Sequence, residues 1–178
     1  MTSPEDQQRT SLRVWSRRAV LAVGLAALVP GRASAATGVR VGDLSMIIPP
    51  SVSQVDDPAL GAGWQWQGVA GRPEQPSMII LARADLPSID AREVLAALLS
   101  TGIAGGVPVA HTPPEPRSMP GGKQVRTVLT LAGRRPYRGA MLITTRDEPP
   151  AGVVVVLGDD SLTAQSIDAV LESVQWVG

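Results

Sequence analysis

His111 is the only histidine in this 178-residue chain, so any Ser-His-Asp triad or imidazole metal site would have to use it. It precedes Thr112-Pro113-Pro114, a composition typical of an exposed loop. The chain contains no Gly-x-Ser-x-Gly motif, the sharp turn that presents a nucleophilic serine in many hydrolases, and it has no cysteine to act as a nucleophile. We therefore predict that His111 is solvated, and we assign no catalytic residue.

Two carboxylate pairs, Asp56-Asp57 and Asp159-Asp160, are the remaining candidates for metal binding. A calcium loop supplies several oxygen ligands at alternating positions, and neither pair has that spacing. The glycine-rich segment 101–106 is not followed by the Gly-Lys-Ser/Thr of a phosphate-binding loop. We expect the carboxylates to cap helices and turns, and segment 101–106 to end a helix. The prediction is therefore no metal and no cofactor.

Two tryptophans, Trp64 and Trp66, could bind a sugar or a partner protein, because an indole ring buries a large area and keeps a donor available. The strict alternation Trp64-Gln65-Trp66-Gln67 predicts a half-buried strand that places both rings on one face. The chain has no phenylalanine, so the favoured interpretation is that these rings supply bulk to the core.

A basic cluster in a predicted turn is the second candidate for partner binding. Arginine and tyrosine are enriched in the residues that dominate protein–protein affinity, although an exposed basic turn is more often simply solvated. The cluster consists of Arg134, Arg135, Tyr137 and Arg138.

The elements that would position these residues centre on three predicted strands, Val125–Leu131, Ala140–Thr145 and Val153–Leu157. Short turns join them, which predicts an antiparallel meander. The last of the three is apolar throughout and is predicted to be the central strand. Strands are also predicted at Val39–Ile48, ending at Pro49-Pro50, and at Ser77–Ala84, which is expected to pair with the tryptophan strand.

Two helices complete the predicted fold. Asp90 as the N-cap, Glu93 in a capping box and a hydrophobic staple of Ile89 with Val94 mark the first, which is expected to end at Gly102. A short edge strand at 107–110 and an exposed proline-rich loop at 111–122 follow, and the segment Asp159-Asp160-Ser161 is expected to open the second helix. We predict an α+β fold with about six antiparallel strands in the order β-β-β-α-β-β-β-α.

The first 35 residues have the layout of a secretory signal peptide: a basic stretch, an apolar run at 19–29 and a small-residue cleavage site. The apolar run is too short to span a membrane. The sequence Ser16-Arg17-Arg18-Ala19-Val20-Leu21 resembles a twin-arginine signal, with Val20 in place of the usual phenylalanine. An ordinary signal with a chance arginine pair and an uncleaved anchor are the alternatives. The predicted export residues are Ser16, Arg17, Arg18, Val20, Leu21, Ala33 and Ala35.

Cleavage near Ala35-Ala36 would release residues 36–178 as a secreted, extracytoplasmic domain without a stable membrane span. Its partners during export would be the twin-arginine (Tat) translocase and signal peptidase. Residues 1–35 contain five of the 16 basic residues and two of the 16 acidic residues, so residues 36–178 carry a net charge of −3. A mildly acidic domain is a poor nucleic-acid binder, and we expect no nucleic-acid partner.

The predicted element order resembles the PsbP-like fold through two motifs: a first strand that ends in Ile47-Ile48-Pro49-Pro50, and a last helix that finishes with Leu171-x-Ser173-x-x-Trp176. That group includes the extrinsic photosystem subunit, a eukaryotic Ran-binding import factor and actinobacterial exported lipoproteins of the LpqN type. The resemblance covers most of residues 38–177 and implies an actinobacterial source. The cysteine that would carry a lipid in the lipoproteins is absent.

Both motifs of this resemblance are structural, so the resemblance implies an accessory or binding role only by analogy. The sequence thus predicts an exported, non-enzymatic binding protein of PsbP-like type, with an extracytoplasmic protein or small ligand as its partner. The alternative is a small secreted hydrolase that uses His111 or carboxylates.

Overall fold

The computed structural model describes residues 35–177 apart from positions 62, 73, 105–107, 120–121 and 134. Its central element is strand β10 (Ala151–Gly158), all eight residues of which are buried. Val153 and Val155 pack into one hydrophobic cluster, and Val154 and Val156 pack into another on the opposite face. A strand buried on both faces must be apolar throughout, and this is why the uninterrupted valine run predicted the central strand correctly.

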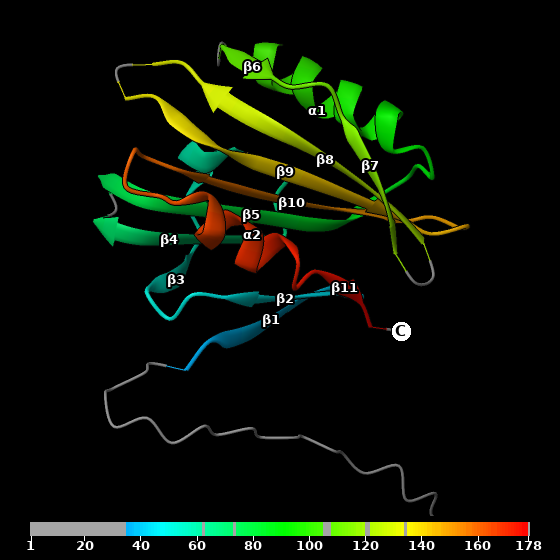
Figure 1. Cartoon of the computed structure of the whole chain (residues 1–178), viewed down its shortest axis with the longest axis horizontal. Coiled ribbons are helices and arrows are strands. Elements are labelled where there is room, and N and C mark those ends of the chain that lie inside the picture. Colours follow the sequence, from blue (N-terminus) through cyan, green and yellow to red (C-terminus); the bar gives the residue numbers. More distant parts are fainter. Residues whose placement is uncertain are drawn as a thin grey trace, which may run out of the picture. The chain divides into compact units, whose positions relative to one another are not determined.

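The larger sheet contains eight strands and is antiparallel in every pairing. Figure 1 shows the long strands lying side by side, with β10 between β5 and β9. The order is β3 (Val52–Val55), β4 (Trp66–Arg72), β5 (Gln75–Leu86), β10, β9 (Tyr137–Thr145), β8 (Gly122–Leu131) and β6 (Val109–His111), and β7 (Glu115–Met119) also pairs with β8. The predicted meander is therefore β8, β9 and β10.

A second sheet of three strands contains β1 (Thr37–Val41), β2 (Leu44–Ile48) and β11 (Gln175–Trp176). The strand predicted over Val39–Ile48 is thus two strands of a hairpin. Gly42, with a φ of 56°, and Asp43 form the turn, because glycine adopts positive φ without a steric penalty. The strand end at Pro49-Pro50 was predicted correctly.

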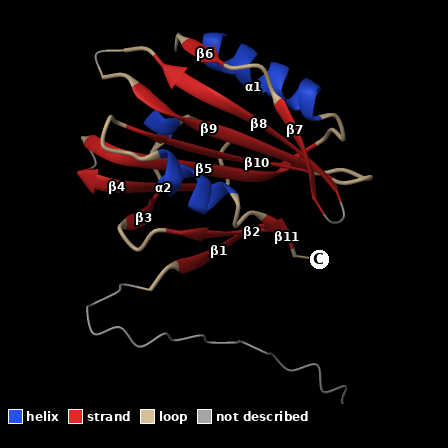
Figure 2. Cartoon of the chain, viewed as in Figure 1, coloured by secondary structure: helices blue, strands red, loops and turns tan. Residues whose placement is uncertain are grey.

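Two α-helices, α1 (Ala91–Ala104) and α2 (Ala164–Leu171), pack on opposite faces of the larger sheet (Figure 2). Ala91, Val94 and Leu95 of α1 join the cluster that contains Val153, whereas Val170 and Leu171 of α2 join the cluster that contains Val154. Strand β2 covers the α2 face as well, through Leu44, Met46 and Ile48. A single 3-10 turn, η1 (Pro58–Leu60), lies between β3 and β4. The predicted α+β class is confirmed, and the described residues form eleven strands where about six were expected.

Both helix starts differ in detail from the prediction. Asp90 Oδ1 accepts the Arg92 N–H at 2.8 Å, as an N-cap does. The Ser88 hydroxyl accepts the Asp90 N–H and donates to Glu93 Oε2, each at 3.0 Å, so the expected capping box is bridged by that serine. Ile89 is 55% exposed and does not lie in the core with Val94. Helix α1 also continues beyond Gly102 to Ala104.

The cap of α2 is Thr163 and not Asp160 or Ser161, because the Thr163 side chain accepts the Ser166 N–H at 3.2 Å. Asp159 instead forms a local turn in which it accepts the Ser161 N–H at 3.0 Å. The acidic pair therefore shapes the approach to α2, and the helix begins later than its sequence suggested.

The end of the chain fastens the smaller sheet to the larger one. The Ser173 hydroxyl accepts the Ile47 N–H of β2 at 2.8 Å and donates to the Val170 carbonyl at 2.6 Å. Trp176 Nε1 donates to Thr144 Oγ1 of β9 at 3.0 Å, and the Arg146 guanidinium lies 4.3 Å from the centre of the indole ring. The spacing Leu171-x-Ser173-x-x-Trp176 thus has a structural explanation.

The proline-rich segment expected to be a loop contains strand β7. Glu115 to Met119 pair antiparallel with residues 122–126 of β8, with Pro116 opposite Val125. A proline is tolerated at the edge of a sheet, because only one side of an edge strand is hydrogen-bonded. This edge hairpin forms one wall of the groove described next.

Candidate binding groove

A hollow of about 600 Å³ lies between the start of α1 and the strands β7, β8 and β9. An adjoining hollow of about 260 Å³ shares Ile89, Lys123 and Thr145 with it. We call the two together the α1–β8 groove. Its remaining lining residues are Asp90, Ala91, Arg92, Pro116, Arg117, Gly122, Gln124, Val125, Arg146 and Asp147.

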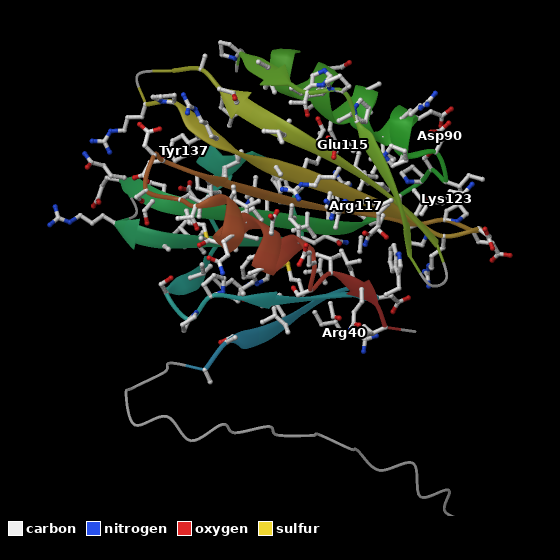
Figure 3. All side chains as sticks on the ribbon, in the orientation of Figure 1. Arg40, Asp90, Glu115, Arg117, Lys123 and Tyr137 are labelled. Carbon is white, nitrogen blue, oxygen red and sulfur yellow. The ribbon has the colours of Figure 1, made fainter. Side chains whose placement is uncertain are left out.

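The register of the sheet brings the floor of the groove together. Lys123 of β8 lies directly opposite Thr145 of β9 and also opposite Ser118 of β7. Gly122 allows this close approach, because a Cβ atom there would lie 2.2 Å from the Thr145 carbonyl oxygen. Figure 3 shows Asp90 and Lys123 at the same end of the sheet, with Arg117 on β7. The groove is therefore built from segments that are distant in sequence.

Three cations that line the groove have no ion pair or side-chain hydrogen bond to any described residue: Arg92, Arg117 and Lys123. All three are exposed. The two acidic lining residues are Asp90, whose carboxylate accepts the Arg92 N–H, and Asp147. The fourth cation, Arg146, stacks on Trp176. The groove therefore carries an excess of positive charge that is open to solvent.

Three arginines outside the groove make intramolecular ion pairs, and so does Arg146 within it, which lies 3.9 Å from Asp43. Arg83 Nε lies 2.7 Å from Asp85 Oδ1, and Arg40 lies 3.2 Å from Asp43. An Arg126 guanidinium nitrogen lies 2.6 Å from Asp168 Oδ1, although the two groups are not aligned as a hydrogen bond. The Arg126–Asp168 pair links β8 to α2 on the face opposite α1. It therefore supports the fold, and the Arg126 guanidinium does not line the groove.

The two tryptophans do not share a face. Trp66 is 6% exposed and packs with the cluster on the α2 face, whereas Trp64 precedes β4 and packs against the cluster on the α1 face. The alternation rule failed because it applies only within a strand, and the strand begins at Trp66. Gly68 makes room for the Trp66 ring, since a Cβ there would lie 2.3 Å from its Cη2 atom.

A shallow hollow of about 280 Å³ adjoins both tryptophans and is also lined by Gln65 and Gln67. The amide groups of these glutamines are engaged inside the protein. Gln67 Oε1 accepts the Asp57 N–H at 3.1 Å, and Gln65 Oε1 accepts the Ala84 N–H at 2.7 Å. These two glutamines therefore hold the loop before β4 in place.

The predicted basic cluster lies at the opposite end of the sheet from Lys123. Tyr137 is half-buried, and its hydroxyl donates to the Pro76 carbonyl at 3.1 Å, which ties β9 to the start of β5. Arg135 and Arg138 are exposed, and Arg134 lies outside the described residues. The hydrogen bonds from Ser161 lower the pKa of Asp159 below its usual 3.8, and the charge of Arg135 adds to this effect. These residues remain a predicted partner-binding site.

His111 lies on the edge strand β6 and is exposed. Within the described part of the chain its Nδ1 contacts a backbone carbonyl, that of Thr112 at 2.9 Å, and not a serine or a carboxylate. The Thr112 hydroxyl is itself engaged, because it accepts the Val128 N–H at 3.1 Å. His111 does not line the α1–β8 groove.

The predicted export residues from Ser16 to Ala33 lie outside the described residues, and Ala35 is exposed two residues before β1. Over the described ranges, no three histidine, aspartate or glutamate side chains come close enough to hold a metal ion. Neither α1, with 14 residues, nor α2, with eight, meets the length and hydropathy needed to cross a bilayer.

Sequence reasoning did not identify the groove as a site. The sequence predicts Ile89 as part of a hydrophobic staple and the wall formed by β7 as a loop, and Lys123 falls between that loop and the strand predicted from Val125. The available signal was weak: Lys123 is the only lysine in the chain. The groove depends on a hairpin at 115–126 that brings Pro116 and Arg117 beside β8, and no local pattern predicted that pairing.

The fold that holds the groove is an antiparallel α+β fold with one helix on each face of the larger sheet. Its structure is similar to the solution structure of cyanobacterial PsbP (CyanoP) from Synechocystis sp. PCC 6803, with a TM-score of 0.59 and 13% identity. The match covers 85% of this chain and 98% of that one. The predicted PsbP-like fold is therefore confirmed, and at this identity the likeness concerns the fold alone.

A protein of Bacteroides thetaiotaomicron matches with 11% identity over 76% of this chain and 46% of its own, and its TM-score of 0.34 supports no argument. The sequence matches no protein-family model and no curated protein.

Proposed function

We propose that this protein is an exported, non-enzymatic binding protein of PsbP-like fold, and that the α1–β8 groove is its binding site. The observation that carries the proposal is the groove itself, along which Arg92, Arg117 and Lys123 are exposed and make no ion pair or side-chain hydrogen bond with any residue that the structure describes. Its main hollow, about 600 Å³, lies within the usual size range of ligand sites, about 300–1,000 Å³. Cations exposed in a hollow and left without internal partners are available to a ligand.

The proposal of export rests on the tripartite layout of residues 1–35 and on the arginine pair Arg17-Arg18. The position of β1 is compatible with cleavage near Ala35, because the first strand begins at Thr37 and Ala35 and Ala36 are exposed. A peptidase would therefore reach its site without disturbing the first strand.

The test has two arms that use the full chain in a producing cell. In the first, Arg17→Lys/Arg18→Lys is compared with wild type by fractionation, and we expect the exported form to be lost. Unchanged export would refute the twin-arginine route, and absence of any exported wild-type product would refute export.

In the second arm, the exported product is used to capture partners from the extracytoplasmic fraction after chemical crosslinking. We expect at least one protein to be enriched over a control without the bait. No enrichment would refute the binding function.

A further inference from the structure

We propose that the occupant of the α1–β8 groove is an acidic segment of another extracytoplasmic protein. This inference rests on the proposed function and adds the chemistry of the partner. Charge complementarity is the first argument. The groove is lined by four cations, Arg92, Arg117, Lys123 and Arg146, and by two acids, Asp90 and Asp147.

The local charge is opposite in sign to that of the domain, which has a net charge of −3 over residues 36–178. Asp90 Oδ1 accepts the backbone N–H of Arg92, and among the described residues no ion pair joins the Asp90 carboxylate to the Arg92 guanidinium. A partner that presents carboxylates would be attracted to this end of the sheet, whereas a basic partner would be repelled from it. Such complementarity mainly raises the association rate and orients the encounter.

Apolar contacts accompany the charges and favour a polypeptide over a bare polyanion. Ile89 is 55% exposed, although most large apolar side chains of the domain are buried. It lines both hollows, and Pro116 and Val125 add apolar surface to the larger one. A segment with acidic and apolar side chains could satisfy both kinds of surface at once. A nucleic acid would gain little from the apolar contacts and would be repelled by the acidic remainder of the domain.

Arginines at the rim of an apolar hollow are typical of affinity-determining interface residues. Arg92 comes from the first turn of α1 and Arg117 from β7, so they approach the groove from its two walls, with Lys123 in the floor. An acidic segment lying between the walls could contact all three cations.

The experiment is site-specific photocrosslinking in the full chain, exported from cells that incorporate benzoylphenylalanine at Ile89. The same label at Gln75, which is exposed at the opposite end of the sheet, is the positional control. After irradiation of the extracytoplasmic fraction, the crosslinked segment is identified by mass spectrometry. We expect Ile89 to capture a segment of another protein rich in aspartate and glutamate, and Gln75 to capture none of it.

Charge variants give the quantitative readout. Arg92→Glu/Lys123→Glu should lower the crosslink yield at Ile89 about tenfold, and Arg92→Gln/Lys123→Gln should lower it about threefold. The control Arg72→Glu reverses an exposed charge at the other end of the sheet, where Arg72 lies opposite Gln75, and it should leave the yield unchanged. Raising the salt concentration from 0.05 M to 0.5 M should lower the wild-type yield, and this readout does not depend on the folding of any variant.

Each outcome decides between the two proposals. Capture of a protein through Gln75 but not through Ile89 would leave the binding function standing and overturn the groove as its site. Capture at Ile89 of a neutral or basic segment, a lipid or a second copy of this chain would overturn the acidic partner, as would a yield that does not respond to charge or salt. No capture at either position would overturn both proposals.

Discussion

Gly139 offers a direct test of the sheet register, because it lies in β9 opposite Leu157 of β10. A Cβ atom at this position would lie 1.8 Å from the Val156 carbonyl oxygen and 2.8 Å from Leu157 Cα. Both of these atoms belong to the backbone of the central strand. We predict that Gly139→Ala destabilises the domain strongly, since neither atom can move by a change of side-chain rotamer.

The magnitude follows from the displacement that the new methyl group requires. Ordinary contact begins at about 3.4 Å, so the strands would have to separate locally by about 1.6 Å. Overpacking in a core costs about 1–3 kcal/mol, and the backbone contact places this variant at the upper end, about 3 kcal/mol. For a domain of this size the corresponding fall in Tm is about 10 °C.

The assay is urea denaturation of the exported domain followed by circular dichroism. Gly38→Ala in β1 is the matched control, because a Cβ there meets no atom within 4 Å and the residue is exposed. That variant should stay within about 0.5 kcal/mol of wild type. If Gly139→Ala also stayed within that margin, the pairing of Gly139 with Leu157 would be wrong.

Two further predictions concern Trp176 and Asp159. Trp176→Phe removes the Nε1 hydrogen bond to Thr144 and weakens the stacking of Arg146. It should lower the free energy of unfolding, measured by urea denaturation, by about 1–2 kcal/mol. A change near zero would mean that β11 does not fasten the smaller sheet to the larger one. Carboxyl NMR titration should give Asp159 a pKa below 3.8, and Ser161→Ala should raise it towards that value. Because the folded-state pKa is the lower one, Asp159 contributes stability above the unfolded carboxyl pKa, and this contribution is lost as the pH falls through the folded value. A wild-type pKa at or above 3.8 would contradict the hydrogen bonds from Ser161.

The parts of the fold that the sequence predicted correctly are those controlled by local pattern. The run Val153–Leu157 could only be a strand buried on both faces, and the structure places it in β10. The strand predicted at Ser77–Ala84 lies within β5, where the side chains of Met78 and Ile80 face one cluster and those of Ile79 and Leu81 face the other. Period-2 alternation predicts such partitions because each residue's side is set by its immediate neighbours.

The elements that were missed depend on partners distant in sequence. Strand β11 has two residues and exists because Gln175 and Trp176 pair with Ser45 and Leu44, 130 or more positions earlier. Strand β7 contains a proline, and only its position at the edge of the sheet makes that residue acceptable. The α1–β8 groove could not be predicted for the same reason, since its walls come from elements whose pairing is set by the whole sheet.

The structure also separates the residues that support the fold from those proposed to bind. Trp66 and Tyr137 are both candidates for binding on sequence grounds. The Trp66 ring is buried in the core and the Tyr137 hydroxyl donates to the Pro76 carbonyl, so replacing either residue should lower stability. Arg92 and Lys123 are exposed and make no ion pair within the described part of the chain, so replacing them should leave stability nearly unchanged and affect only what enters the groove. A variant of Arg92 or Lys123 that unfolded the domain would show that these cations support the fold, and it would remove the reason for assigning them to a partner.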